Sequence, residues 1–160
     1  MNPHPLDLPP PPALLPLAQV LCDVDAVVSL GAAPYGERRF VPLRGGTVRG
    51  ELFSGEIVDG GIDWQIQRQD GVLDIAAHYV VRAPDGGLVE VRSEGMRHGP
   101  AAVMERLARG DAVAPGEYFF RTVMRFQTGA PAWLHLNRVI ALAVGQREAR
   151  RVRLDVYRIS

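Results

Sequence analysis

Apolar and polar residues alternate along much of this 160-residue chain, and such alternation is typical of β-strands with one buried face. The clearest run covers residues 72–82, where one parity consists of Leu73, Ile75, Ala77, Tyr79 and Val81. The opposite parity mixes apolar and ionisable side chains, as expected of a cavity wall or of a half-solvated surface. The Asp70-Gly71 pair just before this run predicts a tight hairpin to the strand that precedes it.

The same alternation predicts further strands along the chain, at residues 17–30, 47–58, 88–95, 118–126 and 152–159. Pro42 lies in the short apolar run 40–43 and predicts an edge strand or a strand end there, because proline has no amide donor. The next residues, Arg44-Gly45-Gly46, predict a turn, and residues 133–144 are mainly apolar.

Only the segment near residues 100–109 has apolar residues at helical spacing. Pro100 suits the first position of a helix, and Gly110 lies just past its end. About nine strands and one short helix predict an all-β fold, an antiparallel barrel or a sandwich. We favour the closed barrel, because closure removes exposed strand edges and because Gly50 and Gly55 provide bends inside a strand.

Proline is concentrated in the first sixteen residues, with four in a row at Pro9 to Pro12. Because proline fixes φ and lacks an amide donor, we expect residues 1–16 to form a flexible, extended arm. A ligand for an aromatic groove is the alternative. Residues 17–160 then form a single barrel domain, and removing the arm should change the melting temperature by only a few degrees.

The charges are balanced, since eighteen arginines face eighteen acidic residues and the chain has no lysine. Such balance gives no electrostatic footprint for nucleic acid or an anionic membrane. No apolar run is long enough to span a membrane, and the first residues do not resemble a secretory signal. Cys22 is the only cysteine, so an intrachain disulfide is excluded. We expect a cytoplasmic protein whose partner is a small hydrophobic or aromatic molecule, and a homo-oligomer such as a homodimer stays open.

Sequence motifs for cofactor loops are absent: the chain has neither a P-loop nor a dinucleotide-binding glycine pattern. It also lacks a nucleophile elbow. Its four histidines have no local metal-ligand spacing, although a metal ion held by distant strands stays open. We therefore expect no cofactor and no metal.

Several polar residues could instead line a cavity. His78 could contact a ligand or act as a general base, or it could lie on the outer wall. Arg121 lies among aromatic residues, so its side chain either extends outward to solvent or pairs with an anion inside. Trp64 is either a core residue or a stacking surface for a planar ligand.

Six short motifs occur in a fixed order: Gly60-Gly61-x-Asp63-Trp64-Gln65, Asp70-Gly71, Asp85-Gly86, Gly95-x-Arg97-His98-Gly99-Pro100, Tyr118-x-Phe120-Arg121-Thr122 and Leu136-Asn137-Arg138. Together they make residues 17–160 resemble the domain of unknown function 3237 (DUF3237) family, also called UPF0311. The resemblance implies a calycin-like antiparallel β-barrel and no generally assigned activity.

The chain departs from this family's pattern at four places. His78 stands where the family usually has arginine, in Ala76-Ala77-His78-Tyr79 instead of Asp-Ala-Arg-Tyr. Phe119 replaces a tyrosine, Gln127 a glutamate and His135 a tryptophan, with Trp133 two residues earlier. If the family uses that Asp-Arg pair, the resemblance implies that His78 and His135 have taken over proton transfer here.

The sequence favours a cofactor-independent isomerase, cyclase or lyase acting on a hydrophobic substrate with a carboxylate or an enolisable carbonyl. His78 or His135 would move the proton, and Arg121 would stabilise the enolate or carboxylate. A lipocalin-like protein that only binds its ligand is the alternative, and a structural subunit is a third reading. We expect Arg121 and His78 to share one lumen with Trp64 and Asn137. The expected ligand contacts are Asp63, Trp64, Tyr79, Arg97, His98, Phe119, Gln127, Trp133 and Asn137.

Overall fold

The computed structural model describes residues 8–160, so residues 1–7 of the predicted arm lie outside the described residues. The elements follow in the order β1 (Leu14–Val24), β2 (Val28–Ala33), β3 (Gly36–Arg49), β4 (Gly55–Ile57), β5 (Ile62–Gln67), β6 (Leu73–Arg82), β7 (Leu88–His98), α1 (Ala101–Ala108), η1 (Pro115–Glu117), β8 (Phe119–Gln127), η2 (Pro131–Arg138), β9 (Ile140–Arg147) and β10 (Arg151–Ile159). The two elements labelled η are short 3-10 helices.

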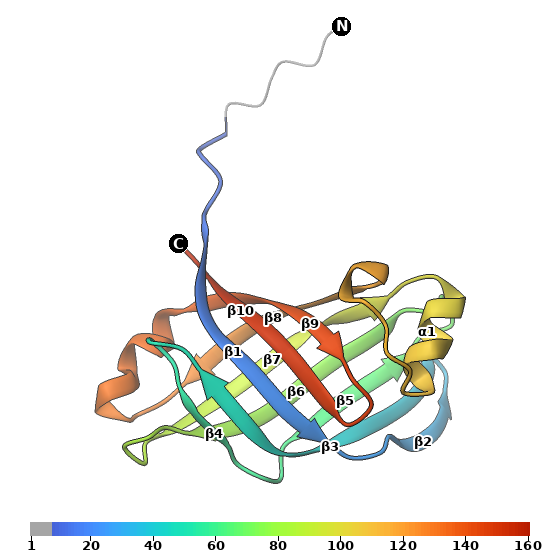
Figure 1. Ribbon diagram of the computed structural model, residues 1–160, viewed down its shortest axis with the longest axis horizontal. Coiled ribbons are helices and arrows are strands. Elements are labelled where there is room, and N and C mark those ends of the chain that lie inside the picture. Colours follow the sequence, from blue (N-terminus) through green and yellow to red (C-terminus); the bar gives the residue numbers. More distant parts are fainter. Residues whose placement is uncertain (1–7) are drawn as a thin grey trace, which may run out of the picture.

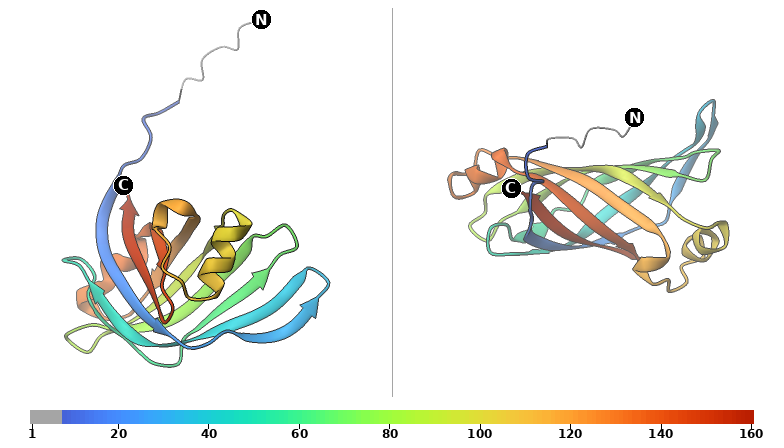
Figure 2. Two further views of the ribbon diagram at one scale, coloured as in Figure 1. Left: turned by 45° about the vertical axis from the view of Figure 1, so that its right-hand side comes forward. Right: turned by 90° about the horizontal axis from the view of Figure 1, so that it is seen from above.

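The strands form one antiparallel sheet that closes on itself as a barrel (Figure 1). Neighbours run in the order β1, β10, β9, β8, β7 and β6, and β3 closes the ring by pairing with β1. Strands β4 and β5 share the position between β3 and β6, at different levels. Strand β2 pairs with β3, and this hairpin extends beyond the barrel (Figure 2). The predicted all-β antiparallel barrel is confirmed.

The buried parity of the barrel strands faces the lumen, as the alternation predicts. On β6 the side chains of Leu73, Ile75, Tyr79 and Val81 are buried, while His78 is exposed. On β8 the side chains of Phe120 and of every second residue after it are buried. Because the side-chain period of a strand is two, the sequence correctly assigns the inner face of both strands.

Three predicted boundaries are wrong near the start of the barrel. Residues 47–58 are not one strand, because β3 ends at Arg49 and β4 begins only at Gly55. Residues 17–30 are not one strand, because β1 ends at Val24 and the chain turns at Asp25, whose carboxylate accepts a 2.7 Å hydrogen bond from Arg44 Nε. Residues 44–46 are not a turn but the middle of β3. Gly46 has a φ of 134° and lies so close to β1 that a Cβ there would be 1.9 Å from the Leu21 carbonyl oxygen. The glycines thus let β3 cross β1 at close range without ending the strand.

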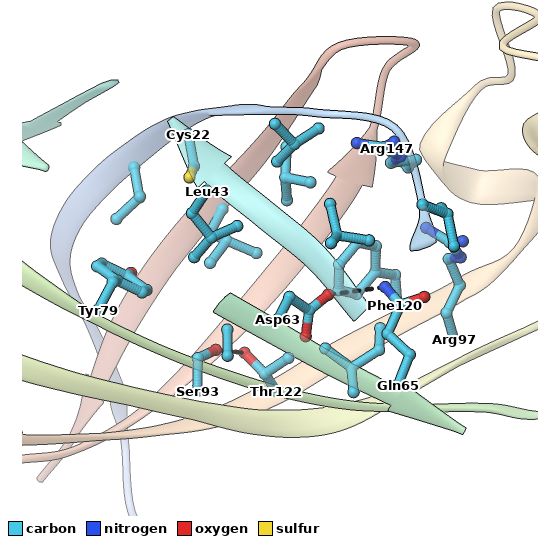
Figure 3. A pocket seen from close by; sticks show the side chains of 18 of the residues that line it. Cys22, Leu43, Asp63, Gln65, Tyr79, Ser93, Arg97, Phe120, Thr122 and Arg147 are labelled. Atoms are coloured by element: carbon cyan, nitrogen blue, oxygen red, sulfur yellow. Dashed lines mark hydrogen bonds between the residues drawn. The ribbon is translucent and has the colours of Figure 1, made fainter. Parts of the chain in front are cut away.

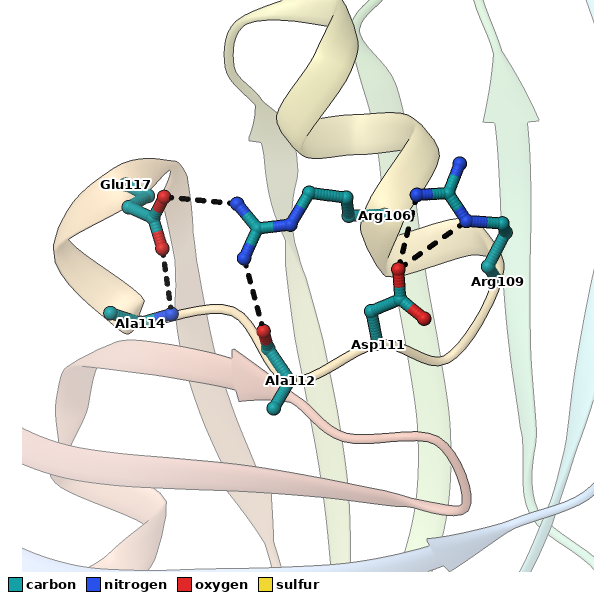
Figure 4. Close-up of polar contacts among 6 residues, drawn as sticks. All are labelled: Arg106, Arg109, Asp111, Ala112, Ala114 and Glu117. Carbon is teal, nitrogen blue, oxygen red and sulfur yellow. Dashed lines mark hydrogen bonds and ion pairs between the residues drawn. The ribbon is translucent and has the colours of Figure 1, made fainter.

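One end of the barrel carries the predicted helix, which the structure confirms as α1. The segment after α1 is held by Arg106, whose guanidinium donates to Glu117 at 3.2 Å and to the Ala112 carbonyl at 3.2 Å (Figure 4). Arg109 pairs with Asp111 at 3.1 Å. This segment lies beside the β9–β10 hairpin, since a Cβ at Gly110 would be 3.2 Å from Ala149 Cβ. Within residues 8–160, no helix is long and apolar enough to cross a membrane.

The opposite end is packed by η2 and large apolar side chains. Phe53 and Phe126 meet edge to face, with ring centroids 5.2 Å apart, and both are buried together with Leu136. The apolar segment 133–144 is therefore divided between η2 and the first half of β9. Because this end is filled by side chains, open space in the lumen lies toward α1.

The barrel begins slightly earlier than predicted. Leu14, Leu15 and Pro16 pair with the last residues of β10, so these three residues belong to the sheet and not to the arm. Ala13 adds a 2.8 Å hydrogen bond from its amide to Ser160 Oγ. Residues 8–12 are exposed and form neither helix nor strand.

Candidate functional site

The lumen holds a cavity that offers about 60 Å³ to the centres of water-sized spheres (Figure 3). About 10–15 Å³ by that measure holds one water molecule, so the cavity takes several waters or a small organic molecule. Most of its wall is apolar. The residues with polar side chains are Cys22, Arg39, Asp63, Gln65, Tyr79, Ser93, Arg97, Thr122 and Arg147.

Strand alternation brings the charged residues of this set to one region. Asp63 and Gln65 are two residues apart on β5 and therefore share its inner face. Arg39 lies opposite Gln65 on β3, while Arg97 and Arg147 lie near the ends of β7 and β9. All of these strand ends are at the α1 end of the barrel, so one carboxylate and three guanidinium groups face the same part of the lumen.

A short relay of hydrogen bonds fixes the carboxylate. Arg39 Nε donates to Gln65 Oε1 at 2.9 Å, and Gln65 Nε2 donates to Asp63 Oδ2 at 2.7 Å. Asp63 Oδ1 is buried and has no hydrogen-bond partner among residues 8–160. Burial raises the pKa of Asp63 to about 6, and the Gln65 hydrogen bond and the charge of Arg97 offset only part of this effect. The carboxyl group thus titrates near neutral pH and keeps one oxygen free.

The arginines are poorly neutralised. None of Arg39, Arg97 and Arg147 forms an ion pair within the described part of the chain. Arg97 is only 9% exposed, and its Nε has no hydrogen-bond partner among residues 8–160. Its guanidinium lies 5.7 Å from the centroid of the Phe120 ring. Burial lowers the pKa of Arg97 to about 10, and repulsion from Arg147 and Arg39 adds to this.

Arg147 and Arg39 show the same effect to a smaller extent. Burial lowers the pKa of both guanidinium groups, while the charge of Asp63 acts in the opposite direction; Glu37 also helps to retain the proton on Arg39. Arg147 Nη1 is buried and has no hydrogen-bond partner among residues 8–160. The backbone amide of Arg147 donates to Tyr118 Oη at 2.9 Å. Tyr118 therefore fixes the backbone from which Arg147 enters the cavity.

The other half of the cavity is neutral. Ser93 Oγ donates to Thr122 Oγ1 at 2.8 Å, and Tyr79 Oη is buried without a partner in residues 8–160. Burial raises the pKa of the Cys22 thiol to about 12, with further contributions from the charges of Asp23 and Asp63. Cys22 is therefore a thiol at neutral pH, and a thiolate nucleophile is disfavoured here.

Three of the residues predicted as ligand contacts line this cavity, namely Asp63, Tyr79 and Arg97. The expectation of a common lumen for Arg121, His78, Trp64 and Asn137 is wrong. His78 lies on the outer parity of β6, half exposed, with Nε2 3.3 Å from Glu90 Oε2. Neither His78 nor His135 reaches the cavity, so within residues 8–160 no histidine is placed there to move a proton.

Arg121 takes the outward alternative. It lies on the exposed parity of β8, and its guanidinium is 5.2 Å from the ring centroid of Phe119. Phe119 in turn stacks on His98 at 4.8 Å between ring centroids. An arginine flanked by aromatic residues in sequence is explained here by stacking on the outer wall, without an internal anion.

The remaining predicted contacts also lie outside the lumen. Trp64 packs against Phe40 on the outer face, with ring centroids 5.3 Å apart. Asn137 Nδ2 donates to the Thr128 carbonyl at 2.9 Å and so secures η2. Trp133 Nε1 donates to Asp85, His135 Nε2 is 2.7 Å from the Leu52 carbonyl oxygen, and Gln127 is exposed at the end of β8.

Sequence reasoning missed Arg39, Gln65 and Arg147. A signal was present, because Arg39 continues the inner parity of Val41 and Leu43, and Arg147 continues that of Ala141 and Ala143. A charged residue in register with buried neighbours at a strand end marks a lumen group. No group of three or more metal-binding side chains occurs within residues 8–160.

Comparison with known proteins gives a consistent picture. A family model described as "Protein of unknown function (DUF3237)" matches residues 12–159. The UPF0311 protein RPA1785 of Rhodopseudomonas palustris is 37% identical over 133 residues, which is 83% of this chain and 87% of that protein. Its crystal structure superimposes with a TM-score of 0.89 at 33% identity and covers 96% of this chain and 100% of that one.

Two further solved structures share the barrel. A "beta-barrel like protein" from Acinetobacter baumannii AYE has a TM-score of 0.83 at 36% identity, covering 97% of this chain and 100% of that one. A protein described as "an enzyme" from Penicillium herquei has a TM-score of 0.73 at 20% identity, covering 97% and 99%. At that identity the likeness shows the fold alone.

Proposed function

Because this chain belongs to the DUF3237 family, whose description assigns no activity, we propose from the cavity itself that the protein binds a small, mainly apolar molecule carrying an anionic oxygen. We propose further that Asp63 moves a proton on this molecule, as in a cofactor-independent isomerase, cyclase or lyase. The observation that supports both is the group of three arginines, one buried and two half-buried, with one carboxylate in a mainly apolar lumen.

The charge balance supports an anionic ligand. With Asp63 ionised, the group carries two positive charges in excess, and with Asp63 protonated it carries three. Buried charges without partners are costly, since each loses its hydration. Arg97 and Arg147 each have a buried nitrogen that no residue in 8–160 accepts from. A carboxylate or an enolate would accept from both and offset the excess charge.

The position and pKa of Asp63 support a general base. A base that titrates near the working pH combines a useful ionised fraction with sufficient proton affinity. Asp63 Oδ2 is occupied by Gln65, so Oδ1 is the oxygen that can accept a proton. The proton leaves a carbon beside a carbonyl, its C–H electron pair forms the C=C bond of the enolate, and the negative charge moves to the carbonyl oxygen. The arginines stabilise that oxygen.

Catalysis of this kind is compatible with the fold. The Penicillium herquei protein, which has the same barrel, is described as an enzyme. The apolar wall keeps bulk water from the enolate, and the proton returns from Asp63 to the ligand, so no oxidant or reductant is consumed. The non-catalytic ligand-binding protein is the second outcome that the experiments below distinguish.

Binding is tested by titration calorimetry with 3-phenylpropanoate at pH 7.5. We expect Arg97→Met to weaken binding at least tenfold, because the variant keeps an unbranched side chain but loses the charge and the guanidinium donors. Arg121→Met is the matched control on the outer wall and should bind as the wild type does. Equal weakening in both variants, or in neither, would refute the proposed site.

Proton transfer is tested by deuterium exchange at C3 of phenylpyruvate in D₂O, followed by proton NMR. The wild type should exchange this position at least a hundredfold faster than the buffer does, and Asp63→Asn should abolish the acceleration while retaining 3-phenylpropanoate binding. Binding without any accelerated exchange would identify the protein as a non-catalytic ligand carrier.

A further inference from the structure

We propose that Tyr79 forms a second, neutral subsite at the end of the cavity remote from the arginines, and that the ligand carries a hydrogen-bond-accepting oxygen there, such as a ketone or an ether. This inference rests on the proposed function, since it assigns the far end of the same ligand. The ligand is then an elongated molecule with an anion at one end and a neutral acceptor at the other.

The first observation is the state of the Tyr79 hydroxyl. Tyr79 is 5% exposed, lines the cavity, and its Oη has no partner in the described part of the chain. Buried hydroxyl groups in native proteins nearly always have a partner, because leaving one without a hydrogen bond is costly. An exception that faces a cavity is therefore a candidate ligand contact.

Neighbouring polar groups already have other partners. Ser93 donates its hydroxyl to Thr122 on the neighbouring strand β8, and the Cys22 thiol lies 3.6 Å from the Asp23 carbonyl oxygen. Figure 3 shows Tyr79 on the opposite side of the cavity from Arg97 and Arg147, with Ser93 and Thr122 between. The hydroxyl therefore needs an acceptor that comes from outside the chain.

The chemistry of the far end selects a neutral acceptor. Burial raises the pKa of Tyr79, so the group is a phenol and donates its proton. No arginine lines the cavity beside it, since the three arginines are gathered at the α1 end. An anion would lose its hydration here without gaining a counter-charge, whereas a ketone or ether oxygen gains a hydrogen bond at small cost.

The strand register sets the distance between Asp63 and Tyr79 along the barrel. Asp63 lies opposite Ala77 of β6, and Tyr79 is two residues farther along the same strand. At about 3.3 Å per residue, Tyr79 is about 7 Å beyond the level of Asp63. Arg97 lies in the other direction, opposite Leu73. A phenyl ring bridges the distance between the level of Asp63 and Tyr79 with its apolar faces against the cavity wall, and the anion lies on the side of Asp63 from which Arg97 approaches.

A pair of ligands of similar shape tests the inference. 3-(4-Acetylphenyl)propanoate has an acceptor oxygen at the far end, and 3-(4-isopropylphenyl)propanoate replaces it with a methyl group. Calorimetry should show the acetyl compound binding about five- to twentyfold more tightly to the wild type. Tyr79→Phe should reduce this preference to less than twofold, while Tyr35→Phe, on the exposed hairpin, should leave it unchanged.

The outcomes separate the two proposals. If both compounds bind the wild type equally and Arg97→Met weakens both, the arginine site stands and the Tyr79 subsite is wrong. The subsite is also wrong if Tyr79→Phe retains the acetyl preference. If neither compound binds, the proposed function fails and the subsite with it. Comparing the two compounds on the wild type alone keeps the test valid even if the Tyr79 variant is poorly folded.

Discussion

Replacing Asp63 by asparagine should stabilise the protein at neutral and alkaline pH. The asparagine has nearly the same shape and keeps an acceptor for Gln65 Nε2, but it cannot ionise. In the unfolded chain the Asp63 carboxyl has a pKa of 3.8, and in the folded protein burial raises this pKa to about 6. Ionisation is therefore less favourable in the folded state, so Asp63→Asn removes a cost.

The sign and the size follow from proton linkage. Well below pH 3.8 the carboxyl is protonated in both states, so the wild type bears no cost. As the pH rises from about 4 to above 6, the unfolded chain ionises first and the wild type loses stability relative to the variant. The difference between 6 and 3.8 corresponds to about 3 kcal/mol, at about 1.36 kcal/mol per pKa unit.

The assay is urea denaturation of the wild type and Asp63→Asn at intervals from pH 4 to pH 8. The difference in unfolding free energy should be below about 1 kcal/mol at pH 4 and reach about 3 kcal/mol at pH 8. Asp74→Asn, on the outer face of β6, is a matched control for loss of a carboxylate and should show no comparable rise. An Asp63→Asn variant that is less stable than the wild type at pH 8 would refute the reasoning, because the arginines would then outweigh the desolvation.

Three further changes test other parts of the structure. Gln65→Leu removes the hydrogen bond that lowers the folded-state pKa of Asp63, so in the same denaturation series the loss of stability should begin at the same pH as in the wild type but continue to higher pH and become larger. Gly145→Val should cost about 1–3 kcal/mol, because a Cβ there would be 2.6 Å from the Phe120 ring, whereas Gly129→Ala has no atom within 4 Å and should cost less than 1 kcal/mol. A chain that begins at Ala13 should have a melting temperature within a few degrees of that of the full chain. A chain that begins at Leu17 loses the pairing of Leu14, Leu15 and Pro16 with β10 and should melt at a measurably lower temperature. Equal melting temperatures of the two shortened chains would contradict that pairing.

The sequence was sufficient to predict the barrel because alternation and burial coincide on most strands. Residues 73–82 and 119–127 show this best, since all inner-parity side chains except Ala77 are buried and all except Thr122 are mainly apolar. Strand ends were harder to predict. The glycines of β3 suggested a turn, whereas the structure uses them for a close crossing with β1, a contact between residues distant in sequence.

The candidate site was predicted only in part, and the reason is geometric. His78 and Arg121 attract attention as ionisable residues among apolar ones, but both have the outer parity of their strands. Arg39 and Arg147 follow the inner parity, but their convergence with Asp63 depends on the shear of the closed barrel, which alternation along one strand does not determine. Assigning every charged residue to the inner or the outer face of its strand would have separated Arg39 and Arg147 from His78 and Arg121.

The central claim is that the arginines at the α1 end of the lumen hold the anion of an apolar ligand. A crystal structure with 3-(4-iodophenyl)propanoate tests it most directly, because the anomalous signal of iodine locates the ligand independently of the protein phases. We predict the iodine inside the barrel near Tyr79 and the carboxylate within hydrogen-bonding distance of Arg97 and Arg147. Iodine found only on the outer wall, for example beside Phe119 and Arg121, would contradict the account.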